Sequence, residues 1–131
     1  MYRLLYYSRF VLRWNERGEV EGAIQDFGVA CQVGARGTPL SLAGNATYRP
    51  PEYRSLVERA NPKQEDIAAV TTPAMDVFAM GKILTELLKD ESFSAEQDQA
   101  LKVLHSMTSR SPILRPNPRH VLEAIDRAFP D

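Results

Sequence analysis

The side chains that could do chemistry in this chain are concentrated in four short strings. They are QDFGVA at 25–30, GNATYRPPE at 44–52, MDVFAMGKIL at 75–84 and Leu114-Arg115-Pro116. Three of the strings contain a carboxylate, and the fourth contains a guanidinium group. A carboxylate can bind Mg²⁺ through oxygen or accept two hydrogen bonds from an arginine. The strings are therefore candidates for a cation site and for an ion pair.

Taken together and in this order, the strings resemble the large lobe of a serine/threonine protein-kinase-like domain. Asp26-Phe27-Gly28 resembles the metal-binding triplet of the protein kinase superfamily. The resemblance implies that these three residues bind ATP with Mg²⁺ and that Asp26 is the metal ligand. By themselves, the same three residues are also compatible with a β-strand that ends in a D-x-G turn.

The second and third strings match the segment that closes the kinase activation loop and the start of the central helix of the large lobe. The residues that match G-T-x-x-Y-x-A-P-E are Gly44, Tyr48, Pro51 and Glu52, while Asn45 and Pro50 depart from it. The residues that match S-D-V-W-S-x-G include Asp76 and Gly81, while Phe78 replaces the Trp.

The resemblance also implies two structural roles. In that family, the Asp at the position of Asp76 steadies the backbone of the catalytic loop. The Glu at the position of Glu52 pairs with an arginine before the last helix, where this chain has Arg115. We therefore expect a buried, bidentate ion pair between Glu52 and Arg115, a geometry for which arginine is suited.

The family's catalytic loop, H-R-D-x-x-x-x-N, falls on residues 2–9, and only Arg3 matches it. Leu4 stands where the Asp that accepts the substrate proton is expected, and Leu cannot accept a proton. Arg9 stands at the second metal-binding position, where a cation would repel Mg²⁺. No glycine loop or nucleotide-pairing Lys precedes Asp26, so the resemblance lacks the small lobe. We assign no catalytic residue and expect the isolated chain to be inactive.

Three functions remain open. The first is a kinase-like large lobe whose family reaction is ATP-dependent phosphorylation of Ser or Thr on a protein substrate, with a missing small lobe or a second chain as a further partner. The second is a pseudokinase or scaffold module that binds a partner protein through residues 29–52 and 53–72 without catalysis. The third is an unstable fragment, for which aggregation would be evidence.

Composition fits one globular domain. The chain has 131 residues, 44% of them apolar and 25% charged, with a net charge of −1. The expected divisions are a catalytic-loop remnant and hairpin at 1–28, an activation-segment equivalent at 29–52, and a helical subdomain at 53–131. Because acidic and basic residues are interspersed, we expect no nucleic-acid partner. Because the apolar runs are short, we expect no membrane span. No signal peptide is recognised, so we expect a cytoplasmic location or delivery into a cytosol.

The elements that must position these strings are mainly α-helices with one small β-hairpin, as in the C-terminal lobe of a protein kinase. Strands are predicted at 10–14 and 20–25 around a turn at 15–18, followed by a long loop at 29–45. A short helix is expected at 52–59, and the polar, aperiodic stretch 60–71 reads as an insertion.

Three longer helices follow from caps and periodicity. Thr72-Pro73 is a capping hydroxyl followed by proline, Ser94-x-x-Gln97 is a capping box, and Asn117-Pro118 repeats the pattern of a cap before a proline. The predicted buried stripes are Val77, Met80, Gly81, Leu84, Leu87 and Leu88 on the first helix, Leu101, Leu104 and Met107 on the second, and Val121, Leu122, Ile125 and Phe129 on the third.

Several other side chains could be modified or reactive. Thr38, Ser41 and Thr47 are phosphorylation candidates in the activation-segment equivalent, with Arg3 as the expected partner of a phosphate, although they are equally compatible with simple loop hydroxyls. The lone Cys31 is read as a small apolar side chain that suits a reducing compartment. His105 and His120 are read as ordinary helix residues.

Overall fold

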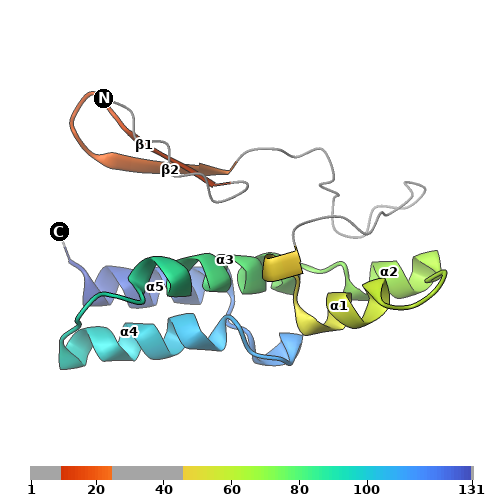
Figure 1. Cartoon of the computed structure of the whole chain (residues 1–131). Helices are drawn as coiled ribbons and strands as arrows, with labels where there is room; N and C mark the ends of the chain where they lie inside the picture. Colours follow the sequence, from red (N-terminus) through yellow and green to blue (C-terminus); the bar gives the residue numbers. More distant parts are fainter. Residues whose placement is uncertain (1–9, 25–45, 131) are drawn as a thin grey trace. The chain divides into compact units, whose positions relative to one another are not determined.

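The computed structural model of this chain describes residues 10–24 and 46–130. Its contacts divide the chain into two compact units, 1–32 and 33–131, and each is described by itself (Figure 1). The described residues form one β-hairpin, five α-helices and two short 3₁₀-helices. The mainly helical fold class is therefore confirmed, while the predicted single kinase-like domain at 1–131 and its divisions remain a prediction.

The hairpin consists of β1 (Phe10–Trp14) and β2 (Val20–Ile24), which pair antiparallel with Phe10 opposite Ile24. It confirms the predicted strands over their described residues. The turn closes because Asn15 Oδ1 accepts hydrogen bonds from the N–H groups of Arg17, at 2.9 Å, and Glu19, at 3.0 Å. Gly18 has φ of 77°, a left-handed conformation that glycine adopts without steric cost.

Two short helices open the second unit, after the 3₁₀-helix η1 (Ala46–Tyr48). Helix α1 (Pro51–Val57) lies close to the predicted helix 52–59. Helix α2 (Gln64–Val70) lies within 60–71, the polar, aperiodic stretch that reads as an insertion and for which no helix is predicted. Helix α2 has seven residues, and Ile67 is the one that is buried. Because a single buried position cannot repeat at helical spacing, the sequence shows no apolar periodicity here. The stability of α2 comes from packing against α1 rather than from propensity.

Helix α3 (Pro73–Leu88) begins where the sequence predicts and carries Asp76 in its first turn. Thr72 occupies the N-cap position with an extended backbone, but its hydroxyl makes no capping hydrogen bond, contrary to expectation. The Met75 N–H, one of the groups that a cap would satisfy, instead donates to the Thr72 carbonyl at 3.0 Å.

The caps of the last two helices are confirmed. At the start of α4 (Ala95–Ser106), the Gln97 N–H donates to Ser94 Oγ at 3.3 Å, and the Ser94 N–H donates to Gln97 Oε1 at 2.9 Å. At the start of α5 (Pro118–Ala128), Asn117 Oδ1 accepts from the Arg119 N–H at 2.8 Å. Between these helices lies the second 3₁₀-helix, η2 (Pro112–Leu114).

Helices α3, α4 and α5 lie side by side, and α1 and α2 lie beyond one end of them (Figure 1). Their shared core contains Val77, Leu104, Met107 and Val121. Leu122 was expected in this core but is 60% exposed, because it lies about 100° around α5 from Val121. Phe129 is also partly exposed, and its ring meets that of Phe93 edge-on at a centroid distance of 6.2 Å.

Gly81 allows α3 to approach the end of α4 closely. A Cβ atom at this position would lie 2.6 Å from Met107 Cβ and 3.0 Å from Thr108 Cγ2. The glycine shared with the kinase-like string is thus required here by packing.

Among the described residues, no single helix is both long and apolar enough to cross a membrane. Helices α2 and α3 reach that length and apolarity only together, across a bend of 56°.

Candidate functional site

Glu52 and Arg115 are held by short, proline-bounded segments. Glu52 is in the first turn of α1, directly after Pro51. Arg115 follows η2 in an extended conformation, and its N–H donates to the Pro112 carbonyl at 3.3 Å. Because proline fixes φ on both segments, the two backbones present these side chains with little conformational freedom.

The two side chains form the bidentate pair that the motifs predict. Arg115 Nη1 donates to Glu52 Oε1 at 2.6 Å, and Nη2 donates to Oε2 at 2.8 Å. The Arg115 side chain is fully buried, whereas the Glu52 side chain is 17% exposed. The pair joins residues that are 63 positions apart in the chain.

Three backbone carbonyls complete the arginine's surroundings. Arg115 Nε donates to Ser109 O at 3.0 Å, Nη1 to Ala74 O at 2.9 Å, and Nη2 to Arg110 O at 3.5 Å. With the two bonds to Glu52, these account for all five N–H groups of the guanidinium. Its carbon also lies 5.0 Å from the centre of the Phe78 ring, within cation–π range. Arg115 therefore connects α1, the start of α3 and the segment after α4.

The electrostatics of Glu52 follow from this pairing. Burial alone would raise the pKa of its carboxyl group. The hydrogen bonds from Arg115, a hydrogen bond from the Glu52 backbone N–H and the arginine's charge outweigh burial, so the pKa is lowered. The carboxyl group is therefore held in its charged form.

Asp76 has a different environment. The Asp76 side chain is exposed to solvent, but the surrounding protein removes part of the hydration of its carboxyl group, and this raises the pKa of that group. The Asp76 carboxylate makes no hydrogen bond or ion pair with residues 10–24 or 46–130. The role expected of it, steadying residues 2–9, involves a segment outside the described part of the chain and stays a prediction.

Several predicted site residues lie outside the described residues. These are Leu4 at the expected base position, the cofactor-binding Asp26, Phe27 and Gly28, and the phosphorylation candidates Thr38 and Ser41, together with Arg3, Arg9 and Cys31. Thr47 is described and lies exposed in η1. His105 and His120 are exposed, and no group of three His, Cys, Asp or Glu within the described residues could hold a metal ion.

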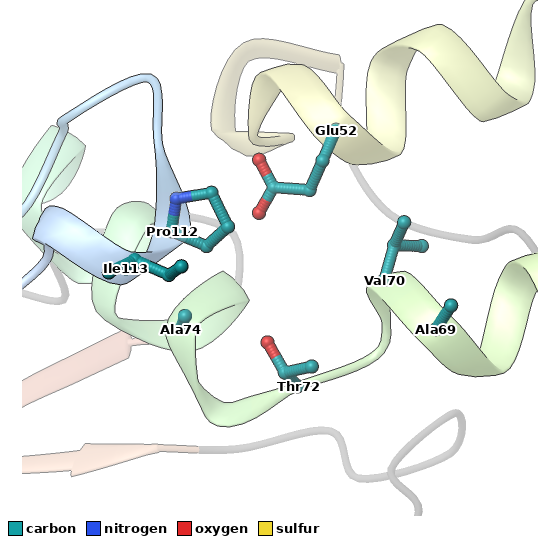
Figure 2. A pocket seen from close by; sticks show the side chains of 7 residues that line it. All are labelled: Glu52, Ala69, Val70, Thr72, Ala74, Pro112 and Ile113. Carbon is teal, nitrogen blue, oxygen red and sulfur yellow. The ribbon is translucent and has the colours of Figure 1, made fainter.

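A groove that sequence reasoning missed lies beside the ion pair (Figure 2). It has a volume of about 360 Å³ and is lined by Glu52, Ala69, Val70, Thr72, Ala74, Pro112 and Ile113. These residues come from α1, the α2–α3 junction and η2, so no local pattern brings them together. The one available signal was the apolar pair Ile113-Leu114, which belongs to none of the predicted helical stripes.

Comparison with protein-family models, curated proteins and solved structures finds no match for this chain. The resemblance to protein kinases rests on the four strings, and any function drawn from it is a proposal.

We predict that Arg115→Ala lowers the free energy of unfolding by about 3–5 kcal/mol, because Glu52 is left partly buried without its partner. Urea unfolding of the full chain measures this loss. Arg119→Ala, which removes an exposed arginine from the first turn of α5, is the matched control and should stay within about 0.5 kcal/mol of the parent. Equal effects of the two substitutions would contradict a structural role for the pair.

The lowered pKa of Glu52 predicts an acid-dependent loss of stability. A carboxyl group whose folded pKa lies below its unfolded value stabilises the fold above the unfolded pKa, about 4.3 for a glutamate, and loses this contribution as pH falls through the folded pKa. Glu52→Gln should be less stable at pH 7 and should show a flatter decline below about pH 4.3. Glu58→Gln, at an exposed position after α1, should decline in parallel with the parent.

Proposed function

We propose that this chain is a protein-kinase-like large lobe. The family reaction is transfer of the ATP γ-phosphate to a Ser or Thr hydroxyl of a protein substrate in a cytosolic compartment. The observation that carries the proposal is the Glu52–Arg115 pair, because the order of the motifs predicts this contact between residues distant in the chain.

The positions of the other described strings support the same proposal. Helix α3, which contains the string 75–84, contacts η1 of the preceding string and η2, which leads into the final one. Phe78, which replaces the tryptophan of the family pattern, lies against the Arg115 guanidinium. Three of the four strings are thus in mutual contact around α3.

The chemistry retained by the chain would be incomplete. ATP and Mg²⁺ are the cofactors that the resemblance implies, with Asp26 as the proposed metal ligand. Leu4 and Arg9 stand where the proton acceptor and the second metal ligand are expected. The isolated chain would therefore lack both a base and a complete metal site.

A pseudokinase or scaffold module that binds a partner protein is the second candidate. The observation that favours it is the exposed apolar surface at η2, where Ile113 is 90% exposed and Leu114 is 69% exposed. Neighbouring exposed apolar side chains of this kind commonly mark protein contact sites.

The proposed kinase-like arrangement predicts that Asp76 steadies the backbone of residues 2–9. If so, Asp76→Ala should speed amide hydrogen exchange within 2–9 by about 10- to 100-fold, because hydrogen bonds to a charged acceptor would be lost. Asp98→Ala, which removes an exposed carboxylate from the first turn of α4, is the control. Unchanged exchange within 2–9 in both variants would argue against the kinase-like arrangement.

We also predict that the full chain transfers no radiolabel from γ-labelled ATP to a generic protein substrate, because Leu4, which cannot accept a proton, stands where the base is expected. Transfer of radiolabel that Asp26→Ala abolishes would overturn this prediction.

A thermal shift with Mg·ATP separates the two candidate functions. Retained nucleotide binding predicts that Mg·ATP raises the melting temperature, that Asp26→Ala removes this rise, and that the control Asp90→Ala, at an exposed position, keeps it. No rise, together with a co-purifying protein, favours the scaffold.

A further inference from the structure

The groove beside the Glu52–Arg115 pair has the size and lining of a ligand site. Its volume of about 360 Å³ is within the range typical of small binding pockets. Most of its lining is aliphatic, from Ala69, Val70, Ala74, Pro112 and Ile113. Figure 2 shows the Glu52 carboxylate and the Thr72 hydroxyl directed into the same space from opposite sides.

The two polar side chains at this groove, Glu52 and Thr72, can each accept a further hydrogen bond. The Glu52 carboxylate accepts two bonds from Arg115 and one from its own backbone N–H, whereas an ionised carboxylate offers about four acceptor positions. The Thr72 oxygen makes no capping bond. Arg115, behind the carboxylate, has all five N–H groups engaged and offers none to the groove.

The groove lies at the C-terminal end of α2, where Ala69 and Val70 contribute to its lining. The Thr71 N–H caps this end by donating to Ile67 O at 3.0 Å. The C-terminal end of a helix is the negative end of its dipole, which favours a nearby cation. Pro112 has no N–H to offer, and no Lys or Arg belongs to the lining.

We propose that this groove binds a lysine or arginine side chain from a segment of a partner protein. Such a side chain combines an aliphatic stem, which suits Val70 and Ile113, with a cationic head that only donates hydrogen bonds. The head would lie at Glu52 and the carbonyl end of α2. This assignment rests on the chemistry of the groove and does not require that the chain be related to protein kinases.

The test is a titration of the ¹⁵N-labelled full chain with a capped pentapeptide that has one lysine between glycine pairs. The amide signals of Val70, Thr72 and Ile113 should shift, and those of α4 should not. The same peptide with an acetylated lysine keeps the stem and loses the charge. It should bind at least about tenfold more weakly, because charge-assisted hydrogen bonds are lost.

Two neighbouring substitutions make the test specific. Ile113→Lys places a competing cation at the rim of the groove and should weaken peptide binding by about tenfold or more. Leu114→Lys makes the same change at an exposed position outside the lining and should stay within about twofold of the parent. Both positions are exposed enough that an unchanged melting temperature is expected and serves as the folding check.

Four results would overturn the proposal. The first is equal binding of both peptides, and the second is signal shifts away from the groove. The third is equal effects of the two substitutions. The fourth is concentration-dependent shifts at Val70, Thr72 and Ile113 without peptide, which would assign the groove to a second copy of this chain.

Discussion

The buried guanidinium of Arg115 is the constraint on which the arrangement of the helical unit depends. A cation removed from water is strongly unfavourable unless every N–H group finds an acceptor and the charge is balanced. Glu52 balances the charge, and the carbonyls of Ala74, Ser109 and Arg110 take the remaining N–H groups. Because these acceptors come from three separate segments, satisfying one side chain fixes α1, the start of α3 and the segment before η2 together.

The same interaction decides the character of the neighbouring surface. Arginine uses all of its donors internally, whereas glutamate keeps acceptor positions and part of its exposure. The ion pair is neutral as a whole, but the side that reaches the groove is the acceptor. Together with the C-terminal end of α2 and the aliphatic side chains of η2, this is the surface for which we propose an aliphatic cation as ligand.

As a kinase-like lobe, the molecule would keep the elements that hold the large lobe together and lack those that do chemistry. The ion pair, the helix that carries Asp76 in its first turn, and the glycine that lets α3 approach α4 are all structural features. In such a lobe, Leu4 and Arg9 would occupy the positions where phosphoryl transfer needs a proton acceptor and a metal ligand. A scaffold would need only the structural features, and the exposed Ile113 would be available to bind a partner protein.

The sequence by itself determined the features that depend on neighbouring residues. The Asn15 turn, the Ser94 and Asn117 caps and the stripe of α3 are short-range patterns, and the structure contains all of them. The Glu52–Arg115 contact is long-range, and it could be anticipated only because a family resemblance supplied the pairing. The fold class at the level of helices with a hairpin follows from the same local signals.

Only the tertiary structure decided the helix at α2, the exposure of Leu122, the acceptors of Arg115 and the groove. A seven-residue helix with one buried side chain shows no apolar periodicity in the sequence. An apolar stripe does not show how much of the helix surface the neighbouring helices cover. Every residue carries a carbonyl, so the sequence cannot show which carbonyls converge on one guanidinium. That convergence, and the groove beside it, are set by where distant segments meet in space.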